Sequence, residues 1–237
     1  LDLTQAYTNP LYAFLSIIPA YFGIDTVLFF KLLALLLLAF FTFAFTKSLS
    51  NRVIGLSTIA FLFASPSLVI HAFSGLETFA YAAFLGLALI GLERHEYKRS
   101  TLYILLAVLC RPEAWLWTAL LPLSIIAIEV QRERASSLTL PKPILTALNS
   151  TSIRRALVGV LPGIVLAAML VIHKVHFGYF LPNTFYVKSA SGAVFDPVTF
   201  VFLAVLGLSP LIVAMMAGRR LVPIVILVYF LPVIYNY

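Results

Sequence analysis

Long apolar runs separated by short polar segments set the pattern of this sequence. The runs are continuous, without the residue-by-residue alternation of a membrane β-barrel, and this favours helices. A helix crosses the hydrocarbon core of a bilayer with about 20 apolar residues, a length that most of the runs approach. The pattern predicts membrane helices at residues 27–46, 53–73, 75–92, 102–110, 114–130, 156–172, 197–217 and 221–235.

Two apolar segments are too short to cross a bilayer by themselves. The run at 102–110 is better interpreted as the first half of a helical hairpin over 102–130, which turns at Arg111 and Pro112. Pro112 disfavours helix at the residue before it and suits the first position of the following helix. Residues 11–22 are amphipathic in part, which predicts a juxtamembrane helix lying at the membrane interface.

Composition agrees with this pattern. The chain is 62% apolar and 11% charged, with a mean hydropathy of +1.05, whereas a soluble domain is about half apolar and a quarter charged. We therefore expect an all-α fold, a polytopic transmembrane helical bundle that forms one domain over 1–237. Residues 1–26 supply an outer loop and the juxtamembrane helix, and 27–237 supply about eight membrane helices. The chain begins at Leu1, ends at Tyr237 within an apolar run and has no signal-peptide pattern, so we expect an internal fragment of a longer protein.

The net charge of +7 follows the predicted topology and does not indicate nucleic acid. An alternating path places twelve of the sixteen Lys and Arg residues on one side, which the positive-inside rule assigns to the cytoplasm. It leaves Asp2, Glu77, Glu113 and Asp196 on the outer side of the cell inner membrane, where chemistry is then expected. The twelve basic residues are Lys47, Arg52, Arg94, Lys98, Arg99, Arg132, Arg134, Lys142, Arg154, Arg155, Arg219 and Arg220.

Two acidic motifs on the outer side each have two interpretations. Ser74 and Glu77 have the spacing of a capping box, but Glu77 also offers a carboxylate to a sugar hydroxyl or a metal. Arg111 and Glu113 form an ionisable pair within an apolar stretch, which is costly to bury without partners and is a functional candidate for that reason. The other interpretation is an Arg–Glu pair that only closes the hairpin.

A predicted outer loop at 173–188 combines aromatic rings with amide and hydroxyl groups. Such groups suit sugar stacking, and Lys188 could hold a phosphate as a point charge, although an interfacial aromatic belt has the same composition. His173 and His176 are not an i, i+4 pair and have no acidic cluster beside them, so no metal site is expected. Residues 7–10 (YTNP) by themselves indicate only a helix N-cap and a turn.

Taken together and in order, four segments resemble a family of bacterial glycosyltransferases with the GT-C membrane fold. Residues 5–12 (QAYTNPLY) resemble its GYTNPLW stretch, and residues 74–78 (SGLET) are similar to its SGLET. Residues 111–114 (RPEA) resemble its RPEG, and residues 178–188 (GYFLPNTFYVK) its G-x-x-LPNTFYAK. The similarity covers nearly the whole chain, and the members it most resembles add terminal arabinofuranose to cell-wall arabinan.

The resemblance implies a polyprenyl-phosphate sugar donor and a glycan or other acceptor at the outer face, the face that charge assigns to all four segments. It also implies a catalytic carboxylate in an acidic pair upstream of residues 7–10, so we expect the fragment to lack its own general base. A divalent metal is compatible with this fold but is not required by these residues. The implied substrate-binding residues are Tyr7, Thr8, Asn9, Glu77, Arg111, Glu113, Asn183, Tyr186 and Lys188, with Arg111 and Lys188 on the phosphate.

Two other functions stay open. A solute transporter would also be polytopic, but we would expect repeat-related halves and discontinuous helices at mid-membrane, whereas here polar groups collect on one face. A non-catalytic membrane subunit of an envelope assembly complex is the second, because the expected catalytic carboxylate is not in the chain.

Overall fold

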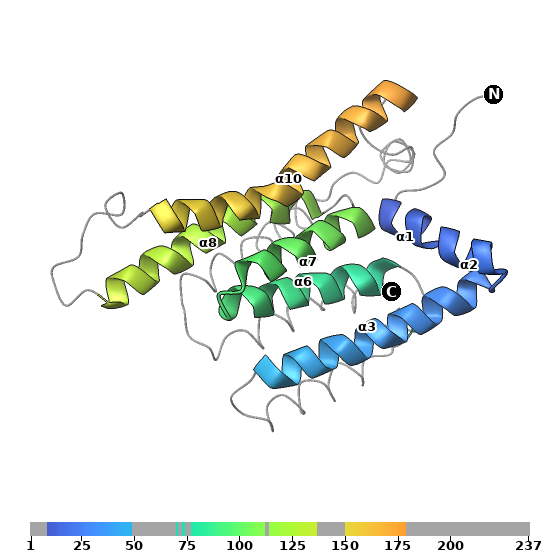
Figure 1. Cartoon of the computed structure of the whole chain (residues 1–237), viewed down its shortest axis with the longest axis horizontal. Coiled ribbons are helices and arrows are strands. Elements are labelled where there is room, and N and C mark those ends of the chain that lie inside the picture. The colour runs from blue at the N-terminus through green and yellow to red at the C-terminus, as the bar shows by residue number, and fades with distance from the viewer. Residues whose placement is uncertain are drawn as a thin grey trace, which may run out of the picture.

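The computed structural model describes residues 9–48, 70, 73, 77–111, 114–136 and 150–178. Every regular element within these ranges is a helix, as expected for an all-α fold (Figure 1). The predicted spans at 53–73 (apart from residues 70 and 73), 197–217 and 221–235 lie outside the described residues. The helices are α1 (Pro10–Leu15), α2 (Ile17–Phe22), α3 (Thr26–Ser48), α6 (Glu77–Glu93), α7 (Tyr97–Cys110), α8 (Trp115–Ser136) and α10 (Ser150–Phe177).

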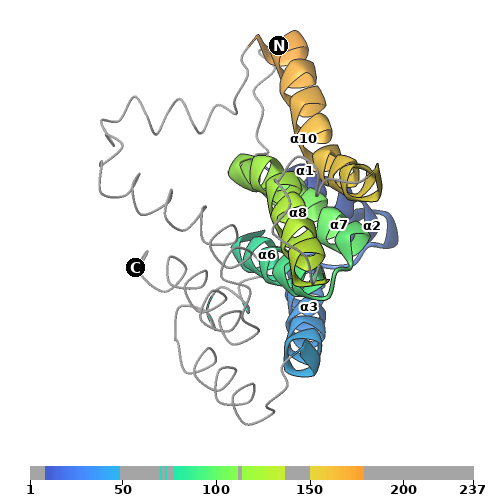
Figure 2. The ribbon, with the colours of Figure 1, turned by 90° about the vertical axis from the view of Figure 1, so that its left-hand side faces the viewer.

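Four helices form a layered bundle in which successive elements run in opposite directions. Helix α6 packs against α7, and α10 packs against both α7 and α8, while α3 lies along α6 (Figures 1 and 2). Helices α3, α6 and α8 run one way, and α7 and α10 run the other. The bundle therefore has two distinct ends: the α1 end, where α6 and α8 begin and α7 finishes, and the opposite end, where α7 and α10 begin.

Small residues on α6 allow close packing on both sides of this helix. A Cβ atom at Gly86 would lie 2.6 Å from a ring carbon of Phe41 on α3. At Gly91 it would lie 2.5 Å from the hydroxyl oxygen of Ser100 on α7, and that hydroxyl donates to the carbonyl of Ala88 at 2.9 Å. Helices that pack through small residues in this way bring their backbones close together, as in membrane bundles.

A tight turn joins α6 to α7 at the end opposite α1. The N–H of Glu96 donates to the carbonyl of Gly91 at 2.8 Å, and that of His95 to Leu92 at 3.1 Å. His95 has a positive φ of 59°, in the left-handed region that few residues other than glycine adopt. Arg94 in the turn and Lys98 in the first turn of α7 therefore both lie at this end of the bundle.

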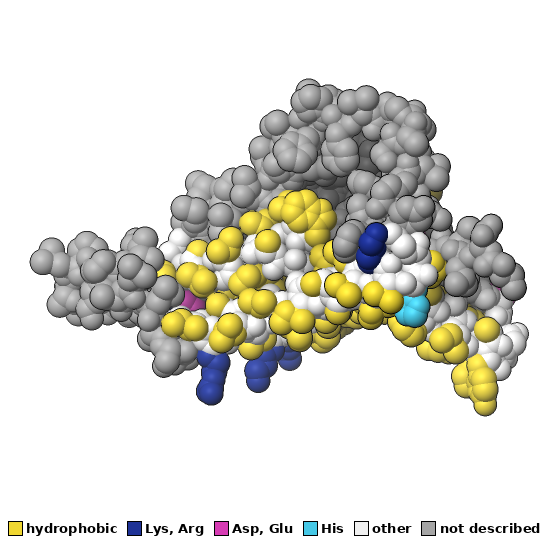
Figure 3. Space-filling model, turned by 90° about the horizontal axis from the view of Figure 1, so that it is seen from above, with side chains coloured by type: hydrophobic (Ala, Val, Ile, Leu, Met, Phe, Trp, Pro, Cys, Tyr) yellow, Lys and Arg dark blue, Asp and Glu magenta, His cyan; other side chains and the backbone are white. Residues whose placement is uncertain are grey.

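Two helices are long and apolar enough to cross a membrane, Thr26–Ser48 and Ser152–Phe177. Only 17% and 22% of their most apolar stretches are buried, so neither is the core helix of the described bundle. Large apolar side chains are exposed on both helices, and Figure 3, which views the molecule from the α10 side, shows many yellow side chains between white ones on this face. Figure 1 shows α10 bending along its length, and the buried Pro162 inside the helix accounts for the bend.

Several predicted boundaries are confirmed within the described ranges. The predicted spans 27–46, 75–92 and 114–130 correspond to α3, α6 and α8. Helix α7 begins five residues before the predicted 102–110, yet its 14 residues extend about 21 Å, still short of a bilayer core of about 30 Å. Helix α7 finishes at Cys110, directly before the predicted turn at residues 111–113, of which 112 and 113 lie outside the described residues.

One predicted helix is refined by the structure and one expectation about a helix end is wrong. The juxtamembrane helix predicted over 11–22 corresponds to α1 and α2, which follow one another through a turn at Ser16 and together cover Pro10–Phe22. Residues 173–177 belong to α10 and not to the predicted outer loop 173–188, because the helix continues through its polar residues. Gly178, with φ of 79°, then ends it in a left-handed conformation.

Candidate functional site

The candidate site lies at the α1 end of the bundle, where three segments far apart in the sequence meet. Asn9 immediately precedes α1, Glu77 is the first residue of α6, and Arg111 immediately follows α7. Helix α1 contacts α7, and Figure 1 shows α1 beside the start of α6 and the end of α7. Three of the four motif segments identified in the sequence are therefore neighbours at this end.

Arg111 is held by its backbone in the turn between α7 and α8. Its φ and ψ of −148° and 129° are extended, as Pro112 requires of the residue before it. Its N–H donates to the carbonyl of Ala107 at 2.9 Å, and its carbonyl accepts the N–H of Ala114 at 3.1 Å. The Arg111 side chain is partly buried, and hydrogen bonds of its own N–H and carbonyl hold the backbone from which it extends.

Tyr12 of α1 connects this end to α3 and α6. Its ring stacks on that of Phe30, with centroids 4.6 Å apart and planes 16° from parallel. Burial raises the pKa of the Tyr12 hydroxyl well above its usual value, and the nearby Cys110 thiol and Glu77 carboxylate raise it further. The hydroxyl is therefore close enough to both groups to interact with them electrostatically.

Cys110, the last residue of α7, completes the group of side chains at this end. It is fully buried, and both Glu77 and Arg111 act on it electrostatically. We call Tyr12, Glu77, Cys110 and Arg111 the α1-end cluster. It combines a carboxylate at a helix N-terminus, where the macrodipole favours an anion, with a guanidinium that carries five donors. A carboxylate can accept from a sugar hydroxyl, and a guanidinium can grip a phosphate.

Sequence reasoning missed Tyr12 and Cys110. Tyr12 is the last residue of the motif at 5–12, and Cys110 directly precedes Arg111. Their positions in or beside the motifs were the feature of the sequence that could have identified them as site residues. They were overlooked because a tyrosine and a cysteine in apolar stretches are most often core residues.

Of the remaining predicted site residues, only Asn9 lies within the described residues. Asn9 occupies the N-cap position of α1, and its carbonyl accepts the N–H of Ala13 at 3.2 Å, but its side chain makes no capping bond. Ser74 of the predicted capping box also lies outside the described residues. So do the predicted binding residues Tyr7, Thr8, Glu113, Asn183, Tyr186 and Lys188.

The end of α10 carries basic and aromatic residues that interact locally. Lys174 donates to the carbonyl of Gly178 at 2.5 Å, and the rings of His173 and Phe177 lie 4.9 Å apart. Cations near a helix C-terminus satisfy its last carbonyls in this way. Across the described ranges, no three or more His, Cys, Asp or Glu residues are grouped so that they could hold a metal ion.

A second polar cluster, which the sequence did not reveal, lies at the opposite end of the bundle. Glu129 of α8 is only 4% exposed, and its two carboxylate oxygens accept from the Tyr97 hydroxyl at 2.6 Å and the Arg155 guanidinium at 2.5 Å. The guanidinium also lies over the Tyr97 ring, 6.0 Å from its centroid, and His95 is 3.1 Å from the Tyr97 hydroxyl. We call Tyr97, Glu129 and Arg155 the Glu129 clasp, because they join α7, α8 and α10.

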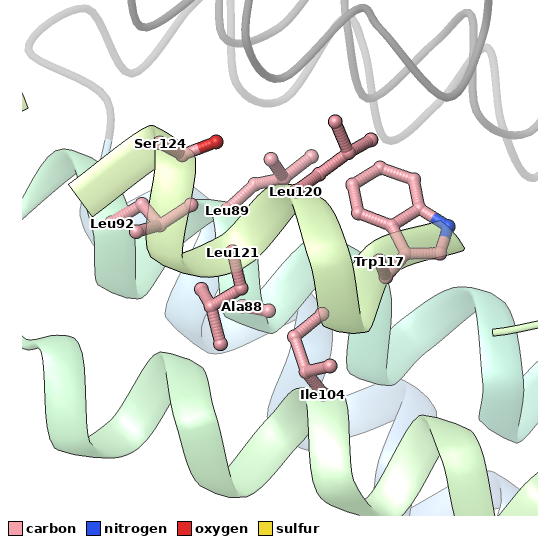
Figure 4. A pocket seen from close by; sticks show the side chains of 8 residues that line it. All are labelled: Ala88, Leu89, Leu92, Ile104, Trp117, Leu120, Leu121 and Ser124. Carbon is pink, nitrogen blue, oxygen red and sulfur yellow. The ribbon is translucent and has the colours of Figure 1, made fainter. Parts of the chain in front are cut away.

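A small cavity lies between α6, α7 and α8, and Figure 4 shows the side chains that line it, among them Leu89, Trp117 and Ser124. Its volume of about 10 Å³ is at the lower limit of the space needed to hold one water molecule. Within the described part of the chain, the buried Ser124 hydroxyl has no hydrogen-bond partner. A cavity of this size cannot hold a sugar or a lipid phosphate, so the α1-end cluster remains the candidate site.

Comparison with known proteins identifies no matching family model, no matching curated protein and no matching solved structure. The function proposed below therefore rests on the chain's own residues and their arrangement.

Proposed function

We propose that this chain is part of a polytopic membrane glycosyltransferase of the GT-C type. In this proposal it moves a sugar from a polyprenyl-phosphate donor to an envelope glycan or another acceptor, at the outer face of the inner membrane. One observation carries the proposal: the segments of Asn9, Glu77 and Arg111, which resemble three separate family motifs, meet at one end of the bundle.

The distribution of exposed side chains supports the membrane placement. The exposed faces of α3 and α10 are apolar, with Leu36 and Leu157 more than 60% exposed, and a soluble protein rarely exposes surfaces of this extent. Exposed aromatic side chains on α1 and α2, such as Tyr21 and Phe22, fit the interface between lipid and water. Basic residues gather at the end opposite the α1-end cluster, which fits a cytoplasmic position for that end.

The chemistry follows from the groups in the α1-end cluster. The acceptor hydroxyl gives its proton to a carboxylate base, which we assign to the acidic pair that the resemblance implies upstream of residues 7–10. The acceptor oxygen then bonds to the anomeric carbon, while the bond from that carbon to the phosphate oxygen breaks and leaves its electrons on the lipid phosphate. Arg111 stabilises this developing charge, and Glu77 accepts from a sugar hydroxyl and so orients the donor. Lys188 is assigned a second positive charge at the phosphate.

The direct test is an assay of transfer with membranes that contain the full-length protein. Radiolabelled sugar should pass from a polyprenyl-phosphate donor to an acceptor glycan, and Arg111→Ala should abolish transfer without lowering the amount of inserted protein. Lys47→Gln, in the last turn of α3 and therefore at the end of the bundle opposite the α1-end cluster, serves as the control and should leave transfer unchanged. If the wild-type protein takes up a solute and transfers no sugar from any polyprenyl-phosphate donor, the transporter alternative replaces this proposal.

Orientation is tested separately by cysteine labelling in intact cells. The native Cys110 is fully buried and is expected to contribute little background, which Cys110→Ala removes altogether. An impermeant thiol reagent should label a cysteine at Ser191 and not one at Ser137. The opposite pattern would place the α1-end cluster in the cytoplasm, where the proposed chemistry does not occur.

A further inference from the structure

At the end of the bundle opposite the α1-end cluster, some cations have an ionic partner within the described part of the chain and others have none. Arg99 pairs with Glu96 at 2.7 Å, and Arg155 pairs with Glu129 in the clasp. In contrast, neither Lys98 on α7 nor Arg154 on α10 makes an ion pair or a side-chain hydrogen bond within the described part of the chain, and both are exposed.

These two cations lie on the same side of the α7–α10 pair. The contact between the Arg155 guanidinium and the Tyr97 ring shows that the two helices lie side by side where they begin. Both helices run in the same direction, and each residue turns about 100° around its axis. Lys98 follows the contact residue on α7 and Arg154 precedes it on α10, so the two rotations bring both side chains to one shared face.

Apolar side chains continue the same face toward the middle of the bundle. Leu102 lies one turn beyond Lys98 and is 51% exposed, and Leu157 and Leu161 lie one and two turns beyond Arg154 and are 64% and 48% exposed. Residues four or seven positions apart share one side of a helix. Along the helix axes, the exposed leucines therefore lie between about 5 and 10 Å from the cations, given the rise of about 1.5 Å per residue.

We propose that this shared face of α7 and α10 is a binding site for an anionic phospholipid. Lys98 and Arg154 bind the phosphate of the headgroup, and Leu102, Leu157 and Leu161 contact the acyl chains. Positive charge directly above an exposed apolar strip matches the two parts of such a lipid, and it attracts the negatively charged lipids of a cytoplasmic leaflet. A soluble anion has no apolar part that could contact the exposed leucines.

This inference rests on the membrane placement in the proposed function and not on sugar transfer. The two can fail separately. A protein that does not fractionate with membranes would overturn the placement, whereas an inserted protein without lipid preference would overturn only the lipid site. A protein that transfers no sugar would leave the lipid site untouched.

Native mass spectrometry of the full-length protein in detergent tests the site directly. Phosphatidylglycerol should bind more tightly than phosphatidylcholine of the same chain length. Each of Lys98→Gln and Arg154→Gln should weaken phosphatidylglycerol binding about fivefold and the double variant about 30-fold, because each cation near the membrane surface contributes a similar attraction. The charge-preserving pair Lys98→Arg and Arg154→Lys should retain binding, which separates loss of charge from loss of folding.

The control is Lys47→Gln, which removes an exposed charge at the same end of the bundle from α3, a helix that packs against α6 rather than α7 or α10. It should leave phosphatidylglycerol binding unchanged. Equal weakening by Lys47→Gln would mean diffuse attraction to a basic surface and would overturn the site. Equal binding of the two lipids, or inorganic phosphate competing on equal terms with phosphatidylglycerol, would overturn it as well.

Discussion

The two ends of the bundle use charged side chains in different ways. In the Glu129 clasp, a buried carboxylate lies within one helix, and its partners come from the first turn of α7 at 2.6 Å and the second turn of α10 at 2.5 Å. In the α1-end cluster, Glu77 and Arg111 lie at helix termini, and the side chains around them come from α1 and α7. The difference shows that the clasp joins α7, α8 and α10, whereas the α1-end cluster gathers the ends of separate segments and is the site proposed for the substrate.

The largest effect is expected from breaking the clasp. Glu129→Ala should lower the free energy of unfolding by roughly 2–3 kcal/mol, because loss of one partner leaves a partly buried guanidinium without its counter-ion. The value is lower than the roughly 3–5 kcal/mol expected for a fully buried ion pair, because Arg155 is 40% exposed and can be hydrated. Thermal unfolding in detergent measures the change.

A matched control for the clasp is Glu96→Ala, which removes the exposed Glu96–Arg99 pair near the same end. That change should cost less than about 1 kcal/mol. If both substitutions shift the unfolding midpoint equally, the clasp contributes no more than a surface ion pair does.

A change at the α1-end cluster should affect transfer and spare stability. Arg111→Lys keeps the charge but loses the planar group that is proposed to hold two phosphate oxygens, so sugar transfer by the full-length protein should fall by at least about tenfold. The unfolding midpoint of the same variant should move little. Transfer rates and thermal unfolding, measured on one preparation, distinguish this outcome from that of the clasp.

The alternative interpretation of Arg111 and Glu113 as a purely structural pair predicts another pattern. Each single substitution by Gln should then destabilise the protein, and the double substitution should recover stability and transfer together. Recovery of transfer in the double variant would remove both residues from the proposed site.

The smallest effect is expected from Tyr12→Phe, which removes the hydroxyl near Glu77 and preserves the ring that stacks on Phe30. Loss of one buried polar contact costs about 1 kcal/mol, which corresponds to about a fivefold decrease in transfer if the hydroxyl helps to position the cluster. Tyr21→Phe, at a tyrosine that is 82% exposed on α2, is the control and should have no effect. Equal rates for Tyr12→Phe and the wild type would limit Tyr12 to packing.

Local features of the fold could be predicted from the sequence, and features that depend on distant contacts could not. The apolar run of α3 and the end of α7 before Pro112 follow from neighbouring residues, so both were predicted within a few positions. The end of α10 was misplaced because polar residues such as Lys174 suggested a loop, although a helix can continue through them to a terminating glycine. Polarity alone was a poor guide to where this helix ends.

The clusters were harder to predict than the helices. Glu129 was visible as one acid in an apolar run, but its partners lie 32 and 26 residues away, on helices whose relative rotation no local pattern determines. The charge pattern and the family resemblance both predicted that the segments of Glu77 and Arg111 lie on one face, but neither predicted that they meet around Cys110, and Tyr12 was not singled out at all. Periodicity identifies helices, but the contacts between their ends depend on packing.

The clasp also has a consequence for the order in which the chain is made. Tyr97 is synthesised before Glu129, but Arg155 leaves the ribosome 26 residues after it. At roughly 5–20 residues per second, the carboxylate waits about 1–5 s for its counter-ion. During that interval α8 carries an acid whose charge is not yet balanced by Arg155, so we expect its final insertion to wait for α10. Biogenesis of this bundle would then proceed in two stages, with α6 and α7 first and α8 and α10 together.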